Sequence, residues 1–304
     1  MTKIQKRLIV FFIGLPAVFS MIVFFPHRNH LLYNFLVLTF TFIAAGEYRN
    51  ILAQKKLFIS LPEAFVLGSI IPAAWILAVS FGENWDINPL DVNPWDFNPT
   101  EIVIIIITLG AFWILASQVF FAKKQLDTCV NRAAAGFSIM IYPGLFMGFM
   151  IRISEFRSAD HYAYMYILLF LLLVFLNDSL AWVTGILFGK NNRGLVAASP
   201  NKSIAGFIGG QLFSVLTGIA ALLLFSEVFI PLTLHPVLTG AILGFGTGLA
   251  GILGDLGEST LKRSSGVKDS GAVILGRGGA LDSIDSLAMA APVYYVLCRI
   301  LFQL

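Results

Sequence analysis

The residues best suited to chemistry lie together in one polar segment, 254–286, of a chain that otherwise carries few charges. Its acidic residues include two pairs, Asp255 with Glu258 and Asp282 with Asp285. Side chains three positions apart share a face of an α-helix, so each pair would present its carboxylates together. Carboxylates without histidine or cysteine suit Mg²⁺, which keeps several waters and bridges to substrate phosphates. The segment therefore predicts a magnesium-dependent site for a phosphorylated substrate.

Basic residues and glycines accompany these carboxylates. The basic residues are Lys262, Arg263 and Lys268, and the glycines between the two acidic pairs include Gly276, Gly278 and Gly279. Lysine and arginine neutralise phosphate charge, and glycines let a backbone approach phosphates closely. An ordinary cytoplasmic loop with solvated or paired charges is the alternative, but packing does not explain so many glycines. The combination favours metal-dependent nucleotidyl transfer.

Two upstream segments add candidate site residues. Asp178 interrupts a long apolar run, and an ionisable side chain at membrane depth is costly unless it faces a polar cavity or partner. We interpret Asp178 as a site residue, with a hydrogen bond between helices as the alternative. The loop that contains Ser199 and Lys202 offers hydroxyls and a cation near the start of a helix, which fits phosphate contact.

The elements that must position these residues are about nine apolar stretches, each long enough to cross roughly 30 Å of hydrocarbon as a helix. They cover approximately residues 8–25, 31–46, 57–81, 101–121, 133–151, 162–189, 204–228, 237–253 and 286–303. With 58% hydrophobic residues in continuous runs, the chain suits helices rather than the alternating strands of a barrel. The sequence predicts an all-α polytopic membrane protein, with an N-terminal transmembrane region over 1–130 and a catalytic transmembrane region over 131–304.

The loops predict which side of the membrane faces the cytoplasm, because cytoplasmic loops are richer in lysine and arginine. Basic residues precede the first stretch and follow the second, fourth and sixth, whereas loop 82–100 is acidic and has no basic residue. With nine crossings and a cytoplasmic N-terminus, segment 254–285 follows the eighth crossing and so lies in the cytoplasm, as expected in a bacterial inner membrane. All 4 histidines fall in predicted external loops, which disfavours histidine catalysis and a zinc site. The net charge of +3 does not suggest nucleic acid as a partner.

The spacing of these residues resembles the signature of the phosphatidate cytidylyltransferases, also called CDP-diglyceride synthases. That signature reads Ser-x-x-Lys-Arg, four residues, Lys-Asp-x-Gly, then Gly-His-Gly-Gly, two residues and Asp-Arg-x-Asp. The matching residues, with every spacing kept, are Ser259-Thr-Leu-Lys262-Arg263, Lys268-Asp269-Ser-Gly271, Gly276-Arg277-Gly278-Gly279 and Asp282-Ser283-Ile-Asp285. The family's upstream motifs are similar to Asp178-Ser-Leu-Ala181-Trp182, Gly185, Gly189-Lys190 and Ser199-Pro200.

The sequence departs from the family pattern while keeping every aspartate. The departures are Arg277 for histidine, Ser283 for arginine, Leu275 for proline and Ala205 for glutamate. One hypothesis is that Arg277 supplies, from the glycine loop, the cation that an arginine would supply at position 283.

The resemblance implies that CTP and phosphatidic acid, taken from the membrane lipid, give CDP-diacylglycerol and pyrophosphate with Mg²⁺ as cofactor. It assigns Asp255, Asp282 and Asp285 to the metal and leaves open a second cation and a homodimer. The catalytic residues that it implies are Asp178, Lys262, Arg263, Lys268 and Asp269. The substrate-binding residues that it implies are Ser199, Lys202, Glu258, Ser259, Gly276, Arg277, Gly278 and Gly279.

Three other functions are alternatives to this one. An ion-coupled transporter with Asp178 as its ion site predicts broken helices in matching positions of two halves, and the sequence has no such internal repeat. A CDP-alcohol phosphotransferase would carry an Asp-Gly-x-x-Ala-Arg motif, which is absent from the sequence. A CTP-dependent polyprenol kinase stays open as the alternative, and it would transfer the γ-phosphate and release CDP.

Overall fold

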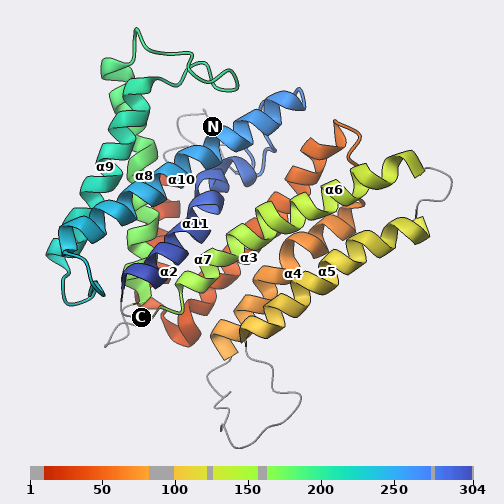
Figure 1. The fold of residues 1–304 in the computed structure, drawn as a ribbon, viewed down its shortest axis with the longest axis horizontal. Helices are drawn as coiled ribbons and strands as arrows, with labels where there is room; N and C mark the ends of the chain where they lie inside the picture. The colour runs from red at the N-terminus through yellow and green to blue at the C-terminus, as the bar shows by residue number, and fades with distance from the viewer. Residues whose placement is uncertain (1–9, 82–98, 122–125, 157–162, 275–277, 303–304) are drawn as a thin grey trace, which may run out of the picture. The chain divides into compact units, whose positions relative to one another are not determined.

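The described part of the chain is built from helices (Figure 1). The computed structural model describes residues 10–81, 99–121, 126–156, 163–274 and 278–302. The α-helices are α2 (Leu15–Phe24), α3 (His27–Ala53), α4 (Leu61–Phe81), α5 (Pro99–Phe121), α6 (Cys129–Ile139), α7 (Met147–Ile153), α8 (Ala163–Phe188), α9 (Ile204–Leu224), α10 (Pro236–Ser264) and α11 (Leu281–Leu301). Shorter helical turns are η1 (Val10–Gly14), η3 (Leu126–Thr128) and η4 (Met140–Phe146). Within these ranges the backbone forms isolated bridges but no strand, which confirms the predicted all-α class.

Eight helical spans in the described ranges are long and apolar enough to cross a membrane. A shorter apolar helix, Phe12–Phe24, corresponds to the first predicted stretch. One of the eight spans, Leu126–Ile153, contains the π-helical turn η4 around Pro143, whose ring removes a backbone donor from the helix. The chain is an integral membrane protein. The number of crossings and the side on which the N-terminus lies stay predictions, and the acidic loop 82–98 lies outside the described residues.

The two helices that carry the polar segment extend beyond their predicted ends. α10 continues past residue 253, and α11 begins before residue 286. The prediction followed the loss of apolar residues, but the ion pair of Glu258 with Lys262 spans one helical turn and supports α10 further. Gly266, with a φ of 73°, then ends the helix in the left-handed conformation that glycine adopts without strain.

The chain divides into two compact units, and the first contains the described residues of 1–152 together with 270–281. In this unit α4 lies against α3, α5, α6 and η4. Glycines let α3 and α4 approach closely, because a Cβ on Gly68 would meet the Cβ of Ala45. The unit thus combines N-terminal helices with part of the polar segment, while the domain boundary predicted at residue 130 stays a prediction.

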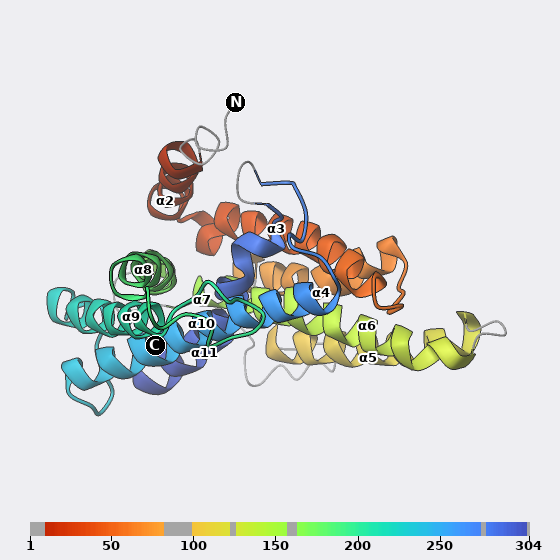
Figure 2. The ribbon, with the colours of Figure 1, turned by 90° about the horizontal axis from the view of Figure 1, so that it is seen from above.

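The second unit contains the described residues of 153–269 and 282–304. Figures 1 and 2 show α8 and α9 side by side, and α10 contacts both of them. Glycines permit this packing, since a Cβ on Gly244 would meet the backbone of Ser214. Tyr294 of α11 donates a hydrogen bond of 2.8 Å to the carbonyl oxygen of Tyr166 in α8. The second unit therefore brings four helices together around the residues described next.

Candidate active site

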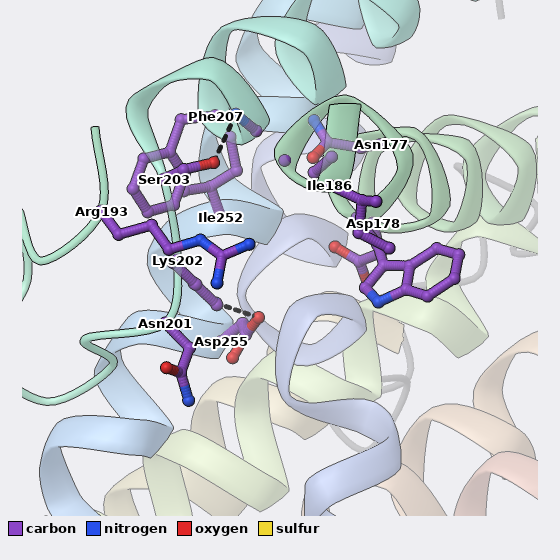
Figure 3. A pocket seen from close by; sticks show the side chains of 14 residues that line it. Asn177, Asp178, Ile186, Arg193, Asn201, Lys202, Ser203, Phe207, Ile252 and Asp255 are labelled. Carbon is purple, nitrogen blue, oxygen red and sulfur yellow. Dashed lines mark hydrogen bonds and ion pairs between the residues drawn. The ribbon is translucent and has the colours of Figure 1, made fainter. Parts of the chain in front are cut away.

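A pocket of about 420 Å³ lies in the second unit, between the end of α8, the start of α9 and α10 (Figure 3). Its charged lining residues are Asp178, Arg193, Lys202 and Asp255. Apolar side chains that line it include Trp182, Ile186, Phe207 and Ile252. Three predicted site residues from separate segments, Asp178, Lys202 and Asp255, therefore share one pocket with an apolar wall.

The loop before α9 forms one wall of the pocket because its end is fixed as a helix cap. Ser203 is the N-cap of α9, and its Oγ accepts a hydrogen bond of 3.1 Å from the backbone N–H of Gly206. The backbone N–H of Ile204 donates to the carbonyl oxygen of Asn192 at 3.0 Å, which folds the loop back on itself. Lys202 thus stands directly before a helix start, as the sequence predicts.

Lys202 pairs with Asp255 across the pocket, as the dashed line in Figure 3 marks. Their side chains are 29% and 32% exposed. At such exposure an ion pair contributes only about 0–1 kcal/mol. Lys202 can therefore exchange Asp255 for another anion, such as a phosphate, at little cost.

Lys262 is held more firmly, between two carboxylates. Its Nζ lies 2.5 Å from Asp282 Oδ1 and also pairs with Glu258 one turn earlier in α10. Glu258 is 1% exposed and Lys262 is 9% exposed. Removing one partner of a buried ion pair leaves an uncompensated charge and costs about 3–5 kcal/mol. This cluster therefore links the end of α10 to the first turn of α11.

Four carboxylates converge in the second unit and repel one another. The charge of Asp285 is opposed by those of Asp255, Glu258 and Asp178. Within the described ranges, no three acidic, histidine or cysteine side chains are grouped closely enough to hold a metal ion as they stand. Asp255 and Asp282 each engage a lysine instead. Hard carboxylate oxygens are nevertheless the donors that a divalent cation prefers, so these residues fit one in chemical type, though not in their present spacing.

Arg263 and Ser199 lie beside the pocket without lining it. Arg263 is exposed, and its Nε donates to the carbonyl oxygen of Ala198 at 3.5 Å. The carbonyl oxygen of Ser199 accepts from the backbone N–H of Lys202 at 3.1 Å. Ser259 is closer to the predicted metal ligands, with its Oγ 3.5 Å from Asp255 Oδ1.

The remaining predicted residues lie on the segment that follows α10. Lys268 and Asp269 are exposed in the second unit. Gly278, in the first unit, has a φ of 111° and forms backbone hydrogen bonds with Ile274. Gly276 and Arg277 lie outside the described residues. The structure thus brings together the predicted residues of α8, α10, α11 and the loop before α9.

Sequence reasoning missed pocket residues that carry no motif of their own. Arg193 and Asn201 line the pocket, yet from the sequence Arg193 is only one of the basic residues that follow the sixth apolar stretch. A signal was available, because both residues lie in the loop that joins two motif-bearing helices and that contains Lys202. Trp182 was part of a motif but was not assigned to the site.

Comparisons with known proteins agree with this arrangement of residues. The chain matches the sequence model of the Cytidylyltransferase family over residues 5–301. A relative from Staphylococcus saprophyticus is 31% identical over 93% of this chain and 96% of its own length. One from Staphylococcus haemolyticus is 37% identical over 83% of this chain and 98% of its own length.

A third relative, from Aquifex aeolicus, is 31% identical over 59% of this chain, and the match spans 62% of the relative. All three relatives are named phosphatidate cytidylyltransferase. The family match covers nearly the whole chain, and two of the relatives align over nearly their entire length. The chain therefore belongs to the cytidylyltransferase family and is a nucleotidyltransferase.

Proposed function

We propose that this membrane protein transfers CMP from CTP to phosphatidic acid, giving CDP-diacylglycerol and pyrophosphate. The observation that carries the proposal is the pocket in which Asp178, Lys202 and Asp255 meet. Relatives that align over most of this chain bear the name of that activity. The polyprenol kinase alternative has no separate observation in its favour.

The lining of the pocket suits a lipid that carries a phosphate. Trp182 and Ile186 on α8 are 69% and 52% exposed, and they offer an apolar surface to acyl chains. Arg193 and Lys202 line the same pocket, where they can bind a phosphate. We infer that phosphatidic acid enters from the bilayer. The basic loops support a cytoplasmic face of a bacterial inner membrane for this site.

The reaction needs positioning and charge neutralisation more than proton transfer. An oxygen of the lipid phosphate attacks the α-phosphorus of CTP, and a new P–O bond forms. The bond from that phosphorus to the bridging β-oxygen breaks, and pyrophosphate leaves with the electron pair. Because the attacking phosphate is already ionised at neutral pH, the site requires no general base. Lys202 and Arg193 would hold the two anions in reacting geometry.

We assign Asp255, Asp282 and Asp285 to hold Mg²⁺, because their carboxylate oxygens suit it and the negative charge of Asp255 opposes that of Asp285. When bound, the ion neutralises charge on the phosphates and on the leaving pyrophosphate. Chelation with EDTA is expected to stop CDP-lipid synthesis, and added MgCl₂ to restore it. Synthesis that continues at full rate after removal of divalent cations would contradict the assignment.

Two positions of label in CTP test the proposed reaction. The purified protein, in micelles that contain phosphatidic acid, is given CTP labelled either in the cytosine ring or in the γ-phosphate. We expect ring label in the lipid product and γ label in pyrophosphate. Entry of γ label into lipid would instead identify a kinase. A folded protein that incorporates neither label would overturn the proposal.

A further inference from the structure

A carboxylate from the N-terminal region contacts both ends of residues 270–281, the second part of the polar segment. Glu47, near the end of α3, is 7% exposed. Its Oε2 accepts hydrogen bonds from Ser270 Oγ at 3.0 Å and from the backbone N–H of Leu281 at 2.9 Å. Its Oε1 accepts from the backbone N–H of Ala280 at 3.1 Å. A single side chain of the first unit therefore ties the two ends of this segment together.

At two positions of the segment, the Glu47 carboxylate lies so close to the backbone that only glycine fits. A Cβ on Gly271 would meet Glu47 Oε1, and its distance to the carboxyl carbon would be only 2.6 Å. A Cβ on Gly279 would meet Glu47 Oε2 and Ser270 Oγ. Any larger residue at either position would displace the carboxylate or the backbone. In this structure, the group that approaches Gly279 closely is thus a protein carboxylate.

The carboxylate also stabilises the start of α11. Leu281 is the first residue of that helix, and the first backbone N–H groups of a helix lack partners within it. A negative charge is favourable at this end of the helix dipole. An ionisable side chain buried in a membrane-spanning helix costs free energy unless it has partners. This cost favours a functional role for Glu47 over simple packing.

We propose that Glu47 is a positioning residue that holds Ser270, Ala280 and Leu281 together and, through Leu281, the first turn of α11. That turn carries Asp282 and leads to Asp285, two of the assigned metal ligands. The inference rests on the proposed function, because it explains how a residue remote in sequence supports cytidylyl transfer. Glu47 acts through the segment that it binds.

Glu47→Gln tests the proposal against a matched variant, Glu63→Gln. An amide offers one acceptor oxygen, and its NH₂ would face a backbone N–H that needs an acceptor. Glu63 lies in the same unit, where its carboxylate instead pairs with Arg132 at 3.6 Å. We expect Glu47→Gln to lower kcat about 10- to 100-fold, as a small misplacement of reacting groups does. Glu63→Gln should keep the kcat of the unchanged protein.

Hydrogen exchange supplies a measurement that does not depend on activity. The amides of Ala280 and Leu281 should exchange faster in Glu47→Gln and at the original rate in Glu63→Gln. Unchanged exchange, or faster exchange with an unchanged kcat, would overturn the proposal. If the unaltered protein makes no CDP-lipid, the proposed function fails, while the exchange result still decides whether Glu47 holds the segment. Should Glu47→Gln not fold, Ser270→Ala removes one donor and should show a smaller change in both measurements.

A double substitution tests the steric part of the inference. Gly271→Ala alone should inactivate the protein, because its methyl group meets the Glu47 carboxylate. In a Glu47→Ala background that space is free, so adding Gly271→Ala should cause no further loss of kcat. If the double variant instead loses kcat by the product of the two single losses, direct contact between the two positions is contradicted.

Discussion

The two parts of the polar segment are held by different means. The end of α10 is fixed by side-chain ion pairs, with Lys262 between Glu258 and Asp282. The carboxylate of Glu47, which lies 233 positions before Ala280 in the sequence, holds instead the hydroxyl of Ser270 and the backbone N–H groups of Ala280 and Leu281. One motif can therefore depend on ion pairs between nearby helices in one part and on a side chain distant in sequence in the other.

The two lysines of the second unit extend this comparison to the pocket. Lys262 and Glu258 are buried and Asp282 is half-buried, whereas Lys202 and Asp255 are more exposed. Buried ion pairs resist the loss of a partner, and exposed pairs exchange partners readily. We therefore expect Lys262 to act mainly on structure and Lys202 mainly on substrate binding.

The largest effect is expected for Asp282→Asn. The substitution keeps the size of the side chain but removes the charge of an assigned metal ligand. Turnover should fall by more than the roughly 10- to 100-fold that is typical of residues which only orient a metal ligand. Assays of CDP-lipid synthesis at equal amounts of membrane-inserted protein measure this loss. Asp127→Asn, at an exposed position in η3, is the matched control and should keep its turnover. Retained turnover in Asp282→Asn would refute the assignment of Asp282 as a metal ligand.

Lys262→Met should reduce stability more than any substitution of Lys202. It leaves two carboxylates without their shared cation, at a cost of about 3–5 kcal/mol. Chemical unfolding in detergent measures the change in the free energy of unfolding. The double variant Glu258→Gln with Lys262→Met should recover part of the loss, because fewer buried charges then lack a partner. An unchanged unfolding midpoint in Lys262→Met would show that Lys262 does not stabilise the fold through Glu258 and Asp282.

Lys202→Ala should have the smallest effect on stability and a moderate one on catalysis. Loss of its exposed ion pair should change the free energy of unfolding by less than about 1 kcal/mol. Loss of one charge-assisted contact to phosphate should lower kcat/KM about tenfold. Initial rates at varied phosphatidic acid and CTP distinguish the two substrates. Lys55→Ala, at an exposed position after α3, controls for the loss of a surface charge. Equal rates in both variants would show that Lys202 does not bind substrate.

Much of the helical fold could be predicted from the sequence, because long apolar runs have few alternatives in a bilayer. The continuation of α10 beyond residue 253 could not be read from hydropathy. It depends on the ion pair of Glu258 with Lys262 and on a left-handed glycine at 266. Helix ends are set by such local contacts rather than by apolar content.

The site was predictable where its residues stand out from their surroundings. Asp178 is an acid within an apolar run, and Asp255 opens a polar stretch at the end of one. Glu47 lies just past the predicted stretch 31–46, so it resembled a solvated helix end. Its role depends on donors from the other end of the sequence, Ser270, Ala280 and Leu281. No pattern within a single segment contains that information.

In the reaction that we propose, phosphatidic acid attacks the α-phosphorus of CTP. To test this step, the purified protein is given phosphatidic acid labelled with ¹⁸O in the free phosphate oxygens, and both products are followed by mass spectrometry. We expect CDP-diacylglycerol that retains all of the label and pyrophosphate that carries none. Labelled pyrophosphate, or a phosphorylated lipid with release of CDP, would contradict it.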